Sequence, residues 1–296
     1  MNCVNGYRLA ACFTRLVEGA AISSHKASCL VGYQGSISQT VWRCTRVWWC
    51  TRSSDLTWRN GRPSLELSGR KMPNLVEQRF SELRRVMVEI IAAHTSLCED
   101  YIGKDQLDER VMAAMARVPR HQFVRVELQQ FAYEDMPLPI GCGKTISQPF
   151  MVALMSDLLD IKEDDSVLEI GTGLGYQSAV LAELAENVYT VEIIEALASE
   201  AQRRLQSEGY TNIHFRIGDG THGWAEHAAY DRIIVTAAPE LIPPALLQQL
   251  KAGGKMVVPA GLGGGQKLLI VEKDIEGKVH TRETIEVRFS PLTVSH

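Results

Sequence analysis

The chain has 296 residues, of which 45% are hydrophobic and 22% charged, and its formal net charge is −4. This length and composition allow one large or two small hydrophobic cores, and no stretch of sequence approaches the roughly 18 uninterrupted apolar residues of a membrane helix. The small negative charge disfavours a dedicated nucleic-acid binder, which usually has a basic face. We therefore expect a cytoplasmic monomer with neither a membrane nor a nucleic-acid partner.

Residues 1–75 differ in composition from the rest of the chain. They contain ten Lys and Arg residues against three acids, a net charge of +7, which leaves −11 for the remainder. Five of the seven cysteines also lie in the first fifty residues, but no Cys-x-x-Cys pair occurs, so we expect free thiols and no metal site. Because this segment has no helical or strand period, it is predicted to be a basic, disordered N-terminal extension.

Three other interpretations of the extension stay open. A basic, acid-poor segment that contains serine is typical of a transit peptide. Its tryptophans and arginines would also suit a nucleic-acid-binding arm, because bases stack on Trp and phosphates pair with Arg. Alternatively, the start codon is assigned too far upstream, and translation begins near Met72 or Met87.

A folded domain is predicted over residues 76–296. Helical spacing of apolar residues predicts helices over 75–94, 107–115 and 151–159, with a Pro/Gly loop over 136–143. Residues 76–150 thus hold N-terminal helices and the loop that separates them from the sheet. From residue 151 strands and helices alternate, which predicts a mostly parallel, doubly wound α/β sheet. The predicted strands are 166–170, 188–191, 213–217, 232–236 and 255–259, and the predicted helices are 176–184, 194–207 and 243–250.

The end of the chain breaks this alternation. Residues 267–272 and 279–289 have the character of strands, and a Glu276-Gly277 turn lies between them. The pattern predicts an antiparallel hairpin at the C-terminal edge of the sheet.

Glycines gather where the first predicted strand turns into the first helix. The sequence from Glu169 to Gly175 reads Glu-x-Gly-x-Gly-x-Gly, at the position where doubly wound sheets bind ligands. Glycine lets the backbone pass close beneath a ligand because it has no Cβ atom. A dinucleotide fingerprint anchored on Gly171 and Gly173 would need glycine at 176, where Tyr176 stands.

This turn resembles motif I of the class I S-adenosylmethionine-dependent methyltransferases, which implies a Rossmann-like fold. The resemblance implies that S-adenosylmethionine is the cofactor and that the motif contacts it through the following residues: Glu169, Gly171, Thr172, Gly173 and Gly175. Glu192 ends the second strand, where a carboxylate can accept both ribose hydroxyls. Asp219 and Gly220 follow the third strand, where that family contacts adenine. Each acid also has an alternative role without a cofactor: Glu192 could be a solvated helix-cap acid, and Asp219 could be a turn former.

Five further blocks are similar to the signatures of protein-L-isoaspartate O-methyltransferases, in matching order and spacing. They are residues 119–124, 143–149, 218–220, 235–239 and 287–292, and the resemblance covers about residues 80–294. The Thr-Ile-Ser-Gln-Pro block at 145–149 is the most diagnostic. The resemblance implies methyl transfer from S-adenosylmethionine to the α-carboxyl of L-isoaspartyl residues in damaged proteins and peptides, which initiates their repair.

Ser147 matches the active-site serine of the resembled family. An isoaspartyl α-carboxyl has a reference pKa of about 3.5, so it is ionised and nucleophilic at neutral pH without a general base. We therefore expect Ser147 to position the carboxylate by hydrogen bonding. A helix N-cap before the predicted helix 151–159 is the alternative role, and the two roles could coexist.

The remaining site expectations concern the substrate and the end of the chain. Thr145 and Ile146 belong to the block around Ser147, and the small side chains of Thr236, Ala237 and Ala238 leave room for an isomerised backbone. Arg288 would attract the substrate carboxylate, or would be an exposed edge-strand arginine. Thr293 matches a family position near the cofactor.

Two other functions compete with this interpretation. The first is a class I methyltransferase that acts on a small molecule or RNA, and the block at 145–149 counts against it. The second is a cofactor-binding protein without catalysis, which the presence of Ser147 and of the cofactor acids disfavours.

Overall fold

The computed structural model describes residues 57–59, 62–64, 75–261 and 265–294. The chain divides into two compact units, Met1–Gly69 and Arg70–His296. In the first unit, β1 (Thr57–Arg59) pairs antiparallel with β2 (Arg62–Ser64). The rest of the predicted extension lies outside the described residues, so its predicted disorder and the alternatives stay predictions.

The second unit is built on a seven-stranded sheet with the order β11-β10-β9-β8-β5-β6-β7. Five neighbouring strands run parallel, and β10 and β11 add to β9 as an antiparallel hairpin. The predicted α/β sheet with an antiparallel C-terminal edge is confirmed. The strands are β5 (Ser166–Ile170), β6 (Asn187–Glu192), β7 (Ile213–Ile217), β8 (Tyr230–Val235), β9 (Leu250–Ala260), β10 (Gln266–Lys273) and β11 (Val279–Val287).

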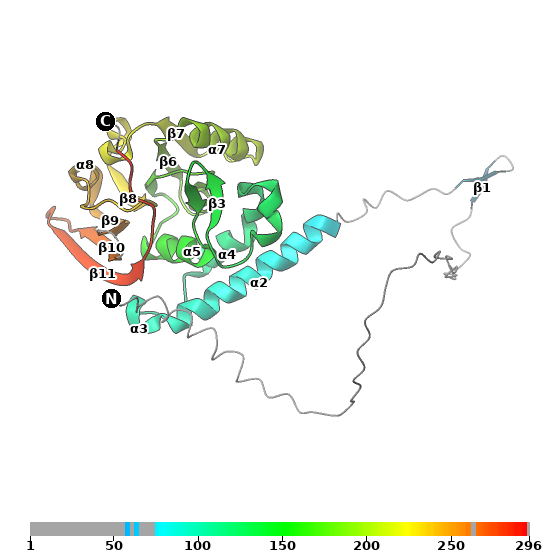
Figure 1. Ribbon diagram of the computed structural model, residues 1–296, viewed down its shortest axis with the longest axis horizontal. Helices are drawn as coiled ribbons and strands as arrows, with labels where there is room; N and C mark the ends of the chain where they lie inside the picture. Colours follow the sequence, from blue (N-terminus) through cyan, green and yellow to red (C-terminus); the bar gives the residue numbers. More distant parts are fainter. Residues whose placement is uncertain (1–56, 60–61, 65–74, 262–264, 295–296) are drawn as a thin grey trace, which may run out of the picture. The chain divides into compact units, whose positions relative to one another are not determined.

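Two apolar cores lie on the two faces of this sheet. Strand side chains alternate in direction, so Val167 of β5 belongs to the larger core and its neighbour Leu168 to the smaller one. In Figure 1 the long helix α2 (Leu75–Leu97) runs beside α4 (Glu109–Arg117) and α5 (Pro149–Leu158), whose buried hydrophobic residues belong to the larger core. The helices α6 (Tyr176–Ala182) and α7 (Glu195–Ser207) join them, whereas α8 (Pro244–Gln249) packs Leu246 into the smaller core.

Short helices complete the second unit. They are α3 (Glu99–Ile102), η1 (Arg120–Phe123), η2 (Val126–Phe131), η3 (Gly220–His222) and η4 (Ala225–His227). None of the helices in the described ranges combines the length and the apolar character needed to cross a membrane.

The predicted loop over residues 136–143 is wrong in part. It contains β3 (Leu138–Gly141), which pairs antiparallel with β4 (Lys144–Ile146). Leu138 and Ile140 are buried on either side of the exposed Pro139, an alternation that the proline and glycines hid in the sequence. Between the strands, Cys142 and Gly143 turn the chain with φ values of 51° and 67°.

The N-terminus of α5 is capped by a carboxylate from outside its own sequence. Asp135 Oδ1 accepts the Phe150 N–H at 2.8 Å, and Asp135 Oδ2 accepts from the Gln148 amide at 2.9 Å. The residue in the N-cap position is Gln148, whose side chain makes no capping hydrogen bond. The alternative role of Ser147 as the helix cap is therefore wrong. The first helical residue, Pro149, has no N–H group, and the N–H of the second, Phe150, is already bonded to Asp135.

Asp135 also holds α2 against this helix end. His94 Nδ1 of α2 lies 2.6 Å from Asp135 Oδ2. The hydrogen bond to Asp135 raises the pKa of His94 above 6.5, although burial opposes the shift. Burial alone would raise the pKa of Asp135, but its bonds to His94, Phe150 and Gln148 outweigh burial and hold that pKa below 3.8.

This pair predicts a pH dependence of stability. Because the folded pKa of His94 lies above 6.5, its stabilisation is complete below that pH and is lost as pH rises through the raised pKa. Urea unfolding should show that His94→Gln costs about 1 kcal/mol at pH 5.5 and much less at pH 9. His222→Gln serves as the control and should show no such difference, because His222 is exposed and forms no ion pair within the described residues. An equal cost of His94→Gln at both pH values would contradict the assignment.

Candidate active site

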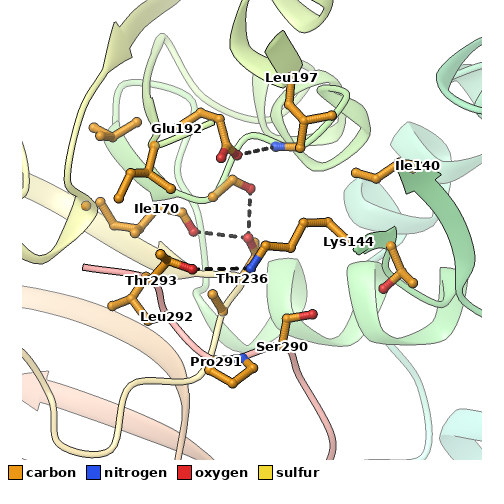
Figure 2. A pocket seen from close by; sticks show the side chains of 17 residues that line it. Ile140, Lys144, Ile170, Glu192, Leu197, Thr236, Ser290, Pro291, Leu292 and Thr293 are labelled. Carbon is orange, nitrogen blue, oxygen red and sulfur yellow. Dashed lines mark hydrogen bonds between the residues drawn. The ribbon is translucent and has the colours of Figure 1, made fainter. Parts of the chain in front are cut away.

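A pocket opens at the carboxyl ends of the central strands, where the chain order of the sheet reverses. From β5 the chain proceeds outward to β6 and β7, then returns to β8 on the other side, which is the usual ligand position in such sheets. Figure 2 shows side chains that are distant in the sequence, from Ile140 to Thr293, converging on this pocket. The lining residues are Ile140, Lys144, Thr145, Ile170, Gly171, Gly173, Val191, Glu192, Ile193, Leu197, Gly220, Thr236, Ala237, Ser290, Pro291, Leu292 and Thr293.

The glycine turn after β5 forms the floor of the pocket and is fastened to Thr236. Thr236 Oγ1 lies 3.0 Å from the Ile170 carbonyl oxygen and 2.7 Å from the Gly171 carbonyl oxygen. The Thr236 hydroxyl therefore donates its hydrogen bond to the backbone of this turn. Gly171 has a φ of 99°, and a Cβ atom there would lie 2.4 Å from Thr236 Oγ1. Only glycine therefore meets both the left-handed conformation and the close approach.

Glu192 joins the turn to the start of α7. One carboxylate oxygen accepts the Gly173 N–H at 2.9 Å, and the other accepts the Ile194 N–H at 2.9 Å. The residue is 6% exposed and lines the pocket. It thus holds the turn in place and also offers a negatively charged acceptor to a ligand.

Glu169 supports the turn from below and does not line the pocket. Ser178 and Thr190 both donate hydroxyl hydrogen bonds to its Oε2, and Thr190 Oγ1 lies 2.6 Å from Thr172 Oγ1. Its Oε1 has no partner among the described residues. Complete burial raises the pKa of Glu169 to about 8, so the carboxyl is largely protonated at neutral pH.

The C-terminal tail closes one side of the pocket. After β11, Ser290 O accepts the Ala238 N–H at 2.8 Å, and the Leu292 N–H donates to Ala238 O at 2.8 Å. This backbone pairing lays the tail along the loop that follows β8. On the opposite side stands the β3–β4 hairpin, whose Lys144 Nζ donates to Thr293 Oγ1 at 3.3 Å.

Ser147 lies directly after this hairpin and is held through its backbone. The Arg120 guanidinium donates from Nη2 to Ser147 O at 2.6 Å and from Nε to Ala132 O at 2.8 Å. Arg120 is fully buried, with its guanidinium carbon 4.7 Å from the ring centroid of Tyr176. The half-buried Ser147 hydroxyl makes no hydrogen bond within the described part of the chain, so it is available to a ligand.

The structure brings half of the predicted site residues into the pocket wall. They are Thr145, Gly171, Gly173, Glu192, Gly220, Thr236, Ala237 and Thr293. Another group surrounds the wall without lining it. This group comprises Ile146, Ser147, Glu169, Thr172, Gly175, Asp219 and Ala238.

Two of the predicted residues have specific positions outside the pocket. The Asp219 carboxylate accepts from the N–H and the hydroxyl of Thr221 and so caps η3, as the turn-former alternative predicts. Arg288 is exposed, as its alternative predicts, but it lies directly after the edge strand β11 and not within it, and it is outside the lining. Their assignment to the cofactor and the substrate stays a prediction.

Sequence reasoning missed nine of the lining residues. Lys144 and the segment 290–292 belong to blocks that were recognised, but no role was predicted for them. The apolar lining residues Ile140, Ile170, Val191, Ile193 and Leu197 have no signal except their positions beside the glycine turn and Glu192.

The lining fits S-adenosylmethionine, the cofactor that the resemblance implies. The glycine turn offers a backbone cradle, and the Glu192 carboxylate can accept ribose hydroxyls. Apolar Ile193 and Leu197 stand next to Glu192 and suit a base. No cluster of three potential metal-ligating side chains occurs in the described ranges.

Comparisons with known proteins agree with this geometry. A model of the protein-L-isoaspartate(D-aspartate) O-methyltransferase family matches residues 93–296. Protein-L-isoaspartate O-methyltransferase 1 of Polaromonas sp. (strain JS666) is 57% identical over 218 residues, which cover 74% of this chain and 92% of that relative.

Solved structures give the same result for the fold. A protein-L-isoaspartate O-methyltransferase structure has a TM-score of 0.62 and 27% identity, and the match covers 70% of this chain and 65% of that one. A Plasmodium falciparum protein in complex with S-adenosyl-L-homocysteine has a TM-score of 0.57 over 64% of this chain and 92% of its own, and at 22% identity it supports the fold alone.

The position of Glu192 predicts the effect of removing it. Glu192→Ala should raise the dissociation constant of S-adenosylhomocysteine about tenfold to a hundredfold, because a hydrogen bond to a charged group is worth roughly 1.5–3 kcal/mol. Calorimetric titration measures this constant directly. Glu195→Ala is the matched control, since it removes an exposed acid from the first turn of α7 outside the pocket lining. Unchanged affinity in a folded Glu192→Ala protein would show that the cofactor binds elsewhere.

Proposed function

The chain belongs to the protein-L-isoaspartate(D-aspartate) O-methyltransferase family and transfers a methyl group from S-adenosylmethionine to L-isoaspartyl residues of damaged proteins, and we propose that Ser147 positions the carboxylate that is methylated. One observation carries this proposal. Thr145 of β4, on the segment that leads to Ser147, and Ala237 after β8 line the same pocket as Glu192 and the glycine turn. Cofactor-binding and substrate-binding segments therefore share one cavity.

The chemistry requires alignment of the reactants more than acid-base catalysis. S-adenosylmethionine supplies a methyl group that its sulfonium already activates. The substrate α-carboxyl, with a reference pKa of about 3.5, is ionised at neutral pH and needs no base to remove a proton. Glu192 and Lys144 are the titratable side chains in the described lining, and both Glu192 oxygens accept backbone N–H groups. The lining thus suits in-line transfer to a nucleophile that is already charged.

Ser147 is suited to hold that nucleophile. Its backbone is fixed by Arg120, and its hydroxyl is not used for capping α5. A hydroxyl can donate one hydrogen bond to a carboxylate oxygen without being deprotonated itself. Small side chains at Ala237 and Ala238 on the facing loop leave space for the extra methylene that an isoaspartyl linkage inserts into a peptide backbone.

The remaining assignments extend this proposal. We propose that Thr145, Ile146, Thr236 and Arg288 contribute to the substrate side. We also propose that Glu169, Thr172, Gly175, Asp219 and Thr293 support the cofactor side. We propose as well that the enzyme acts as a monomer, since one chain supplies every group invoked, and that it works in the cytoplasm without a nucleic-acid partner.

Substrate selectivity tests the proposed function. Labelled methyl groups from S-adenosylmethionine should enter an isoaspartyl peptide as a base-labile ester, with little label in the peptide of identical sequence that contains aspartate. The aspartyl peptide is the matched control because it has the same composition and charge. Equal labelling of the two peptides, or label that resists mild base, would reject the assignment.

Replacement of Ser147 separates positioning from structure. Ser147→Ala should cut methyl transfer roughly tenfold to a hundredfold, because a lost positioning hydrogen bond is worth about 1–3 kcal/mol. S-adenosylhomocysteine affinity and melting temperature should stay unchanged, since Asp135 caps α5. Ser147→Thr should also be slow, because its added methyl group crowds the carboxylate.

Ser207→Ala, at the exposed end of α7, is the control for these measurements and should retain full activity. A Ser147→Ala enzyme with full activity would contradict the positioning role.

A further inference from the structure

Lys144 supplies the positive charge in the described pocket lining. The two charged side chains of that lining are Lys144 and Glu192, and Glu192 is bonded to two backbone N–H groups. Lys144 Nζ contacts only the neutral Thr293 hydroxyl, at 3.3 Å, and within the described residues it forms no ion pair. An ammonium group has three donors, so this one retains the capacity to bind an anion.

The position of Lys144 directs this charge toward the substrate. Lys144 begins β4 opposite Gly141, and the same short strand continues through Thr145 toward Ser147. Figure 2 shows the Lys144 side chain extending from the hairpin across the pocket toward Thr293. Arg288, the residue expected to attract the substrate, is exposed and outside the lining.

We infer that Lys144 binds the α-carboxylate of the isoaspartyl substrate and thereby sets the affinity for it. This inference rests on the proposed function. The carboxylate replaces the Thr293 hydroxyl as the partner of Nζ, and a charge-assisted hydrogen bond replaces a neutral one. Ser147 then orients the same carboxylate from the end of the segment on which Lys144 stands.

Charge pairing of this kind should act on binding and not on the rate of transfer. The carboxylate is negative before methyl transfer and neutral after it, so its attraction to Lys144 weakens as the reaction proceeds. An interaction that is at least as strong in the ground state as in the transition state lowers KM without raising kcat. Lys144 therefore has a kinetic signature different from that of Ser147, whose loss lowers kcat.

The test compares Lys144→Gln and Lys144→Arg with the wild-type protein. Anisotropy of a fluorescent isoaspartyl peptide gives its Kd for the protein saturated with S-adenosylhomocysteine, and calorimetry gives the Kd of S-adenosylhomocysteine itself. We expect Lys144→Gln to raise the peptide Kd and KM about tenfold, with kcat unchanged or raised and the S-adenosylhomocysteine Kd unchanged. Lys144→Arg should restore most of the peptide affinity because it keeps the charge. Lys278→Gln, at the exposed β10–β11 turn, is the control.

Several results would overturn the inference. Weaker S-adenosylhomocysteine binding by Lys144→Gln, with unchanged peptide affinity, would assign Lys144 to the carboxylate of the cofactor. An unchanged peptide Kd in Lys144→Gln, alone or together with a raised Kd in Arg288→Gln, would remove Lys144 from the substrate site. A wild-type protein that neither binds nor methylates the isoaspartyl peptide would reject the proposed function and this inference with it.

Discussion

The buried guanidinium of Arg120 connects the parts of the molecule that must cooperate. It binds the carbonyl oxygens of Ala132 and Ser147, and it stacks on Tyr176, the first residue of α6 after the glycine turn. Burial lowers the pKa of Arg120, yet an arginine starts from so high a value that it stays charged. Within the described residues its Nε and Nη2 are hydrogen-bonded and its Nη1 has no partner. Because a buried charge is costly without hydrogen bonds, the two bonds that are made fix the Ser147 segment relative to the glycine turn.

Around that connection, the site is assembled from segments that are distant in sequence. The parallel strands supply one wall of the pocket through Gly171 and Glu192, whereas the β3–β4 hairpin and the C-terminal tail supply the opposite walls. The tail reaches the pocket because its backbone pairs with Ala238. A pocket enclosed in this way suits methyl transfer, because the carboxylate nucleophile is already ionised and the methyl group is already activated by the sulfonium. The protein then has only to bind the two reactants, align them and exclude water.

Much of this arrangement could be predicted from the sequence, because alternating strands and helices and the residues at strand ends are local signals. The turn from Glu169 to Gly175 and the position of Glu192 followed from that alternation. The β3–β4 hairpin could not be predicted so easily, because Pro139 and the glycines mask its alternation of buried residues. Contacts between segments that are distant in sequence could not be predicted from local patterns. Examples are the capping of α5 by Asp135 and the hydrogen bond from Lys144 to Thr293.

The central proposal is that the glycine turn and the Ser147 segment form one active site. A crystal structure of the protein with S-adenosylhomocysteine and an isoaspartyl peptide tests this most directly. We expect S-adenosylhomocysteine to lie against Gly171 and Glu192, with the peptide α-carboxylate in hydrogen-bonding contact with Ser147 Oγ. A cofactor bound outside this pocket, or a carboxylate that faces away from Ser147, would contradict the account.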